Sequence, residues 1–94
     1  MSDAKKTYID QVRGEMGLEI MRRRLQKGWS ITEMARRADL NRKTVASCEG
    51  GDTSSLDSYH KCCVELGIAI SWLVSWSETM VEKRNQSGYK AANS

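Results

Sequence analysis

The chain has 94 residues, enough for one small domain with a modest core. The sequence shows no signal-peptide pattern and no apolar run near the roughly 20 residues that span a bilayer, so we expect a cytoplasmic protein outside membranes. Its three cysteines, Cys48, Cys62 and Cys63, are an odd number with two adjacent, which fits neither a disulfide framework nor a zinc site and predicts free buried thiols. The net charge is only +3, but residues 1–51 hold 11 Lys and Arg against 7 Asp and Glu, a bias typical of a phosphate-binding surface or of a solvated charged face.

The chain begins with a small, polar and charged segment, residues 1–6, which is predicted to be a flexible arm. A helix is expected from about residue 7 to residue 27, closed by Gly28. Its apolar residues recur at helical spacing: Val12, Met16 and Ile20 form one stripe, with Leu18, Met21 and Leu25 beside it. Gly14 and Gly17 are expected to weaken the first half of this helix by about 1 kcal/mol each relative to Ala.

Two short helices joined by a tight turn are predicted next. The first opens at Ser30, an N-cap followed three residues later by Glu33, which is the spacing of a capping box. Asp39 takes the turn, and Asn41 is a good N-cap for the second helix, residues 42–49. The inward-facing residues are Met34, Ala35, Ala38, Leu40, Val45 and Cys48.

A fourth helix is predicted from a cap at Ser54 or Ser55 to Gly67. Its core residues recur at helical spacing: Leu56, Tyr59, Cys63 and Leu66. His60 has neither a metal set nor a nucleophile near it in the sequence, so we interpret it as a solvated or hydrogen-bonded histidine.

The periodicity changes to two over residues 68–76, the pattern of a β-strand. One face of this strand would carry Ile68, Ile70, Trp72, Val74 and Trp76. A single strand after four helices needs a partner for its backbone donors and acceptors, and the simplest partner is the same strand of a second copy. We therefore expect a dimerisation strand at residues 68–77; a fifth helix that completes the bundle is the alternative. Residues 78–94 are predicted to be a polar tail.

The helix-turn-helix domain then spans residues 7–67. In this layout the second short helix enters the DNA major groove and its first residues meet base edges. The candidates for DNA contact are Ser30, Thr32, Arg36, Asn41, Arg42, Lys43, Thr44, Ala46 and Ser47. Arg42 and Lys43 can reach guanine O6 and N7, whereas Ser30 and Thr32 suit a phosphate at a helix N-terminus. Arg36 is expected to attract phosphate without sequence preference.

Short motifs follow one another in a familiar order: Trp29-Ser30, Glu33-Met34-Ala35, Leu40, Thr44-Val45, Glu49-Gly50 and Leu66-Gly67-Ile68. Residues 28–67 thereby resemble the Cro/cI-type (XRE) helix-turn-helix family of phage repressors and related regulators. The resemblance implies an all-α, lambda-repressor-like bundle of four to five helices. It also implies a structural ion pair between Arg24 and Glu49. The chain departs from the family at Ile31, where a phosphate-binding glutamine is common, and also at Arg23, Asp39 and Cys48.

A narrower resemblance includes the C-terminal strand. Gly28-Trp29, the run from Asp52 to Leu56 and a strand after Leu66 together are similar to the HipB-type antitoxins. This resemblance covers about residues 16–76. It implies a dimeric autorepressor whose C-terminal strands pair between subunits and which binds a kinase-like toxin.

These patterns favour a homodimeric, sequence-specific DNA-binding repressor that reads an inverted-repeat operator with half-sites about one helical turn apart. A phage-type regulator and a toxin–antitoxin autorepressor are the two alternatives within that hypothesis. A protein-interaction module without DNA function, anchored by Trp72 and Trp76 on the strand, is the competing class. No acid–base pair, activated nucleophile or metal set is visible in the sequence, so neither an enzyme nor a cofactor is predicted.

Overall fold

The computed structural model of the protein describes the backbone of residues 7–93 and the side chains of residues 7–86. Within this range the chain forms the helices α1 (Tyr8–Gln26), α2 (Ile31–Ala38), α3 (Arg42–Glu49), α4 (Leu56–Leu66) and α5 (Ile70–Asn93). None of these described helices has both the length and the apolar character needed to cross a membrane. The segment expected to be a flexible arm, residues 1–6, lies outside the described residues.

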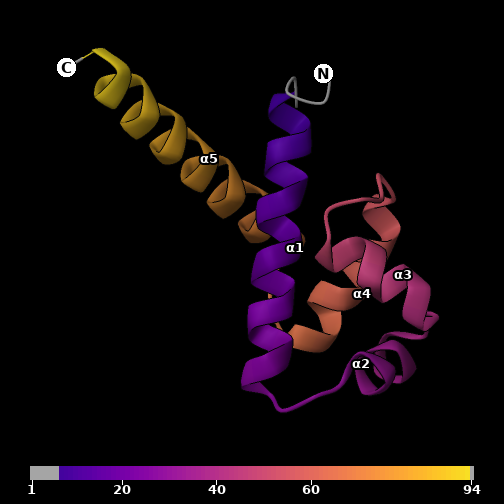
Figure 1. Cartoon of the computed structure of the whole chain (residues 1–94). Helices are drawn as coiled ribbons and strands as arrows, with labels where there is room; N and C mark the ends of the chain where they lie inside the picture. The colour runs from indigo at the N-terminus through magenta and orange to yellow at the C-terminus, as the bar shows by residue number, and fades with distance from the viewer. Residues whose placement is uncertain (1–6, 94) are drawn as a thin grey trace.

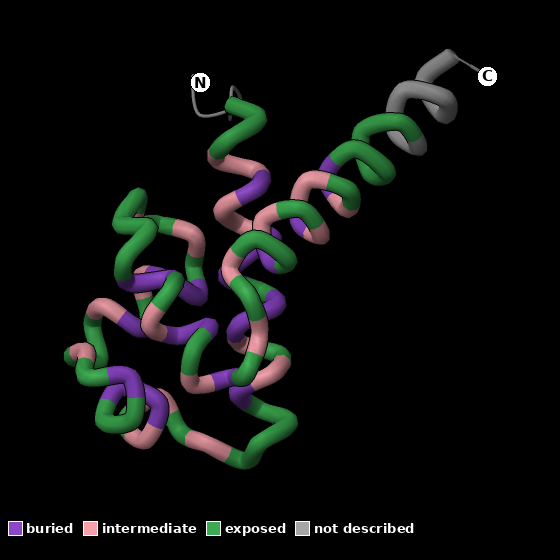
Figure 2. Tube along the Cα trace, turned by 180° about the vertical axis from the view of Figure 1, so that it is seen from behind, coloured by how far each residue is buried: buried purple, intermediate pink, exposed green. Residues whose placement is uncertain are grey.

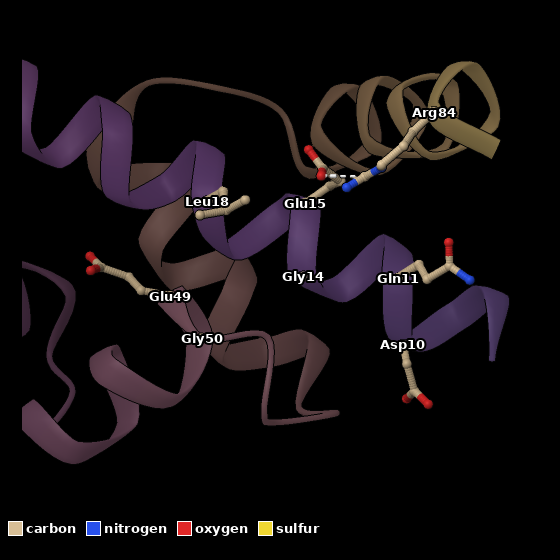
Figure 3. Close-up of a pocket in the computed structure, with 8 residues that line it drawn as sticks. All are labelled: Asp10, Gln11, Gly14, Glu15, Leu18, Glu49, Gly50 and Arg84. Atoms are coloured by element: carbon tan, nitrogen blue, oxygen red, sulfur yellow. Dashed lines mark hydrogen bonds and ion pairs between the residues drawn. The ribbon is translucent and has the colours of Figure 1, made fainter. Parts of the chain in front are cut away.

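Helix α1 is the central element, with α5 along one side and α2, α3 and α4 grouped on the other (Figure 1). Two contacts show that α5 runs antiparallel to α1. The Arg23 guanidinium, near the end of α1, lies 4.9 Å from the ring centre of Trp72 in the first turn of α5. Arg84, further along α5, pairs with Glu15, which lies nearer the start of α1 (Figure 3).

Buried positions lie on all five helices (Figure 2), and they form one core cluster. Its buried residues are Val12, Met16, Ile20, Met34, Ala35, Val45, Cys48, Tyr59, Cys62, Cys63, Leu66, Leu73 and Val81. Val12, Met16 and Ile20 of the first helix are therefore buried, whereas Leu18 and Leu25, predicted beside them, are exposed. The three cysteines are free and buried. Leu56 departs from expectation: it is 61% exposed, because as the first residue of α4 it lies at the rim of the core.

The predicted dimerisation strand at residues 68–77 is wrong: α5 begins at Ile70, and residues 7–93 contain no strand. Short apolar segments often fit both the period of a strand and that of a helix, and residues 68–76 also place apolar residues at helical spacing. Leu73, which the period-two pattern put on the face opposite Trp72, is fully buried. A helix pairs its backbone groups within the segment, whereas a lone strand would need a second chain.

The residues expected to pair between strands have other contacts in the helix. Trp72 and Trp76 lie one turn apart and stack with ring centres 5.8 Å apart. The Arg22 guanidinium lies 5.9 Å from the ring centre of Trp76. The two indoles therefore contact α1 of their own chain. Ile68 precedes α5, and Ile70 and Val74 pack against the core.

The region expected to be a polar tail also differs. α5 continues without a break from Ile70 to Asn93, so nearly all of residues 78–94 belong to the helix that begins in the supposed strand.

Deleting everything after Gly67 is expected to destabilise the whole domain, because α5 contributes Leu73, Ser77 and Val81, all fully buried. Emptying one such apolar site costs about 2–5 kcal/mol, and a domain of this size has only about 5–15 kcal/mol in total. Thermal unfolding followed by circular dichroism should show a Tm lower by about 10 °C or more, or no cooperative transition. A chain ending at Gln86 keeps all three residues and is the control. An unchanged Tm for the shorter chain would contradict the assignment of α5 to the core.

Candidate nucleic-acid interface

A tight turn of Asp39, Leu40 and the N-cap Asn41 joins α2 to α3. Asp39 adopts the left-handed conformation with φ of 58°, which most L residues avoid and which Asp tolerates better than most. The Leu40 amide donates to the Ala35 carbonyl oxygen at 2.9 Å, and the Leu40 side chain packs against the core. These contacts fix the direction of α3 relative to α2, as a helix-turn-helix requires.

The inner faces of both helices are buried through Met34, Ala35, Ala38, Val45 and Cys48. The outer faces therefore lie at the surface, and all the candidate DNA contacts lie on or beside them. The exposed candidates are Ser30, Thr32, Arg36, Asn41, Arg42, Lys43 and Ala46; Thr44 and Ser47 are half-buried.

Ser30 and Asn41 cap the two helices, as predicted. Ser30 Oγ accepts from the Glu33 amide at 3.0 Å, which is one half of a capping box. Asn41 Oδ1 accepts from the Thr44 amide at 2.7 Å. Capping uses the acceptor atoms of these side chains. The Ser30 hydroxyl proton and the Asn41 side-chain NH₂ remain as donors at the two helix N-termini, where an anion is stabilised.

Arg42 and Lys43 are two cations of this surface that have no carboxylate partner within residues 7–86. Both are exposed in the first turn of α3, which contains no acidic residue, and neither forms an ion pair within residues 7–86. Together with Ile31, Thr32 and Ala46 they line an open hollow between the start of α2 and α3. The two helices thus bring together candidates that lie ten or more residues apart in the sequence.

Arg36 is placed differently, because Glu33 holds it. Arg36 Nη2 lies 2.6 Å from Glu33 Oε2, and Arg37 Nε lies 2.7 Å from the same oxygen. The hydrogen bond from Arg36 lowers the pKa of Glu33, which keeps this carboxylate ionised. Arg37 also lies over the Trp29 ring, 4.2 Å from its centre. Exposed ion pairs of this kind are weak, so Arg36 can exchange Glu33 for a phosphate at small cost.

Arg24 and Glu49 form an ion pair between α1 and α3, and both are buried. Arg24 Nε donates to Glu49 Oε2 at 2.6 Å, and Nη2 donates to Oε1 at 3.0 Å. Arg24 Nη1 donates to the Trp29 carbonyl oxygen at 2.8 Å. One guanidinium therefore joins α1 to the end of α3 and to the loop that leads into α2.

Ile31 is the residue of this surface that the sequence patterns did not indicate as a contact. It is half-buried at the first position of α2 and lines the hollow beside Arg42 and Lys43. The signal in the sequence was its position, where the resembled family commonly has a phosphate-binding glutamine, between Ser30 and Thr32.

Within the described residues, no three His, Cys, Asp or Glu side chains lie together in a group that could hold a metal ion. His60 is exposed.

Comparison with known proteins supports the helical architecture. The fold is similar to that of the clp gene regulator ClgR from Corynebacterium glutamicum, with a TM-score of 0.72 and 17% sequence identity over 86% of this chain and 87% of that chain. At this identity the likeness concerns the fold alone. No family model and no curated protein matches the chain. The helical part of the predicted bundle therefore fits, and its C-terminal strand does not.

Proposed function

We propose that the protein is a sequence-specific DNA-binding transcriptional regulator whose α3 enters the major groove. The observation that carries this proposal is the exposed, unpaired pair of cations at the first turn of α3, Arg42 and Lys43. They lie on the outer face of a helix-turn-helix, where direct readout of base edges takes place. The likeness of the fold to a gene regulator supports the same reading.

Each candidate residue has a role in this proposal that suits its chemistry. Arg42 reads guanine O6 and N7, and Lys43 reads a neighbouring base edge or phosphate. The donors of Ser30, Thr32 and Asn41 bind phosphate oxygens near helix N-termini. The remaining contacts are assigned to Arg36 for phosphate and to Thr44, Ala46 and Ser47 for base edges.

The regulator is further proposed to act as a homodimeric repressor on an inverted-repeat operator. A single α3 of eight residues can read only one short half-site. Two copies related by a two-fold axis would read two half-sites about one helical turn apart. A kinase-like toxin is not proposed as a partner, because that expectation depended on the C-terminal strand. The protein-interaction module anchored by Trp72 and Trp76 is not proposed either, because it also required the strand.

Selection of bound sequences from a random DNA pool tests the proposal, followed by affinity measurements on the best sequence. Arg42→Ala with Lys43→Ala should weaken specific binding by about 2 kcal/mol, roughly thirtyfold. The double variant should also make the slope of log K against log salt shallower by about 1, since Lys43 no longer displaces a counterion from phosphate. The selected sequences should contain an inverted repeat.

A charge-matched control removes two lysines outside the helix-turn-helix, with Lys61→Ala in α4 and Lys83→Ala in α5. This control should change the affinity by less than about twofold if the contacts are specific. If both double variants lose the same DNA affinity, Arg42 and Lys43 contribute only general charge attraction and not specific contacts. No measurable DNA affinity at low salt would overturn the proposal.

A further inference from the structure

The hollow between α2 and α3 is lined by both apolar and charged or polar side chains. Ile31 and Ala46 are apolar and face it from different helices, whereas Arg42, Lys43 and Thr32 are polar and charged. Ile31 is half-buried and packs partly against the core, whereas Ala46 is exposed, and both also line the hollow at the surface. An apolar pair in such a place has no use in binding phosphate oxygens.

The DNA major groove offers one apolar group, the 5-methyl of thymine, beside base edges rich in hydrogen-bonding atoms. A methyl group seated against Ile31 and Ala46 would lose its contact with water, which is favourable. Arg42 is next to this apolar pair and would meet the acceptors of an adjacent guanine. The mixture of side chains therefore matches a thymine that neighbours a guanine better than it matches the sugar–phosphate backbone.

We propose that this hollow is a thymine-methyl site, walled by Ile31 and Ala46, and that it makes one thymine per half-site obligatory for tight binding. The proposal rests on the DNA-binding function above and adds a base preference to it. Ile31 is then a specificity residue in its own right, although it carries no polar atom in its side chain.

The test replaces each thymine of the best selected sequence, one at a time, with deoxyuridine, which removes only the methyl group. One thymine in each half-site should show an affinity lower by about fourfold, the effect of burying one methyl-sized group. In Ile31→Ala the same thymine and uracil sites should bind almost equally. The comparison is made within one protein variant, so a modest loss of folding stability does not affect the ratio.

Two further variants make the result decisive. Ile9→Ala removes a similar, 54% exposed isoleucine on α1, away from the hollow, and should keep the fourfold preference for thymine. Ala46→Ser places a hydroxyl in the hollow at an exposed position and should reduce the preference even if Ile31→Ala fails to fold. Three results would overturn the methyl site while leaving DNA binding intact. The selected half-site could lack thymine, or the preference could stay below about 1.5-fold at every thymine. The third is a preference that is unchanged in both Ile31→Ala and Ala46→Ser. If no DNA is selected at all, both proposals fall.

Discussion

Replacing Glu49 with Ala is expected to destabilise the folded domain by about 4 kcal/mol, because it leaves a buried guanidinium without its carboxylate. Arg24 is 7% exposed and Glu49 is 8% exposed, so water cannot easily take the place of the lost oxygens. Arg24 would keep only its hydrogen bond to the Trp29 carbonyl oxygen. A loss of this size is a large part of the stability of a small domain.

Urea unfolding measures this effect, with Glu33→Ala as the matched control. Glu33 also pairs with arginines, at 2.6 and 2.7 Å, but on the surface. Its removal should cost no more than about 1 kcal/mol. Replacing both buried partners, with Arg24→Met and Glu49→Leu together, should recover most of the stability, since no charge is then left unpaired. If Glu49→Ala costs no more than Glu33→Ala, the buried pair does not hold the fold together.

The start of each short helix was predictable because its determinants are local. Ser30 and Asn41 bond to amides three residues ahead, and Ser55 does the same at α4, so the residues that decide these boundaries are neighbours in the chain. Asp39 in the left-handed conformation belongs to the same class of local feature. Because the helix-turn-helix is built almost entirely from such features, its position could be predicted without knowledge of the rest of the fold.

The error at α5 has the opposite cause. Residues 68–76 satisfy the alternation of a strand and the spacing of a helix at once, and only the partner decides between them. That partner is α1, which is more than 40 residues away in the sequence and offers Arg22, Arg23 and Glu15 to the side chains of α5. A pattern read within one segment contains no information about which surface will cover it.

The hollow beside α3 was only partly predictable for a similar reason. The polar members, Thr32, Arg42 and Lys43, were candidates because their chemistry suits DNA. Ile31 was noted only as a departure from a phosphate-binding glutamine, and its apolar partner Ala46 comes next to it only through the fold. Side chains that act through shape and apolar contact are recognised by their neighbours in space, whereas charged groups are recognised by type.

Helix α1 decides where α3 lies, and the contact between them depends on the absence of a side chain. A Cβ atom added to Gly17 would lie 2.7 Å from the carbonyl carbon of Glu49 and closer still to the carbonyl oxygens of Cys48 and Glu49. These are backbone atoms at the end of α3, so no rotamer change can relieve the overlap. The view that Gly17 merely weakens its helix is incomplete, because the glycine lets the two helices cross at backbone distance.

Gly17→Ala is therefore expected to destabilise the domain by about 3 kcal/mol, despite the better helix propensity of Ala. Gly14, one turn earlier in α1, is the matched control, because nothing lies within 4 Å of a Cβ added there. Gly14→Ala should stabilise the domain by up to about 1 kcal/mol. Both free energies come from urea unfolding of otherwise identical chains, so the predicted result is a difference in sign.

The same pair of variants also reports on function. If Gly17→Ala folds at all, α3 must move away from α1, and the carboxylate of Glu49 must move with it away from Arg24. The specific DNA affinity should then fall in Gly17→Ala and stay unchanged in Gly14→Ala, although neither glycine lies on the outer face of the helix-turn-helix. Two variants that both stabilise the domain, with equal DNA affinity, would mean that α3 has room to adjust and that α1 does not set its position.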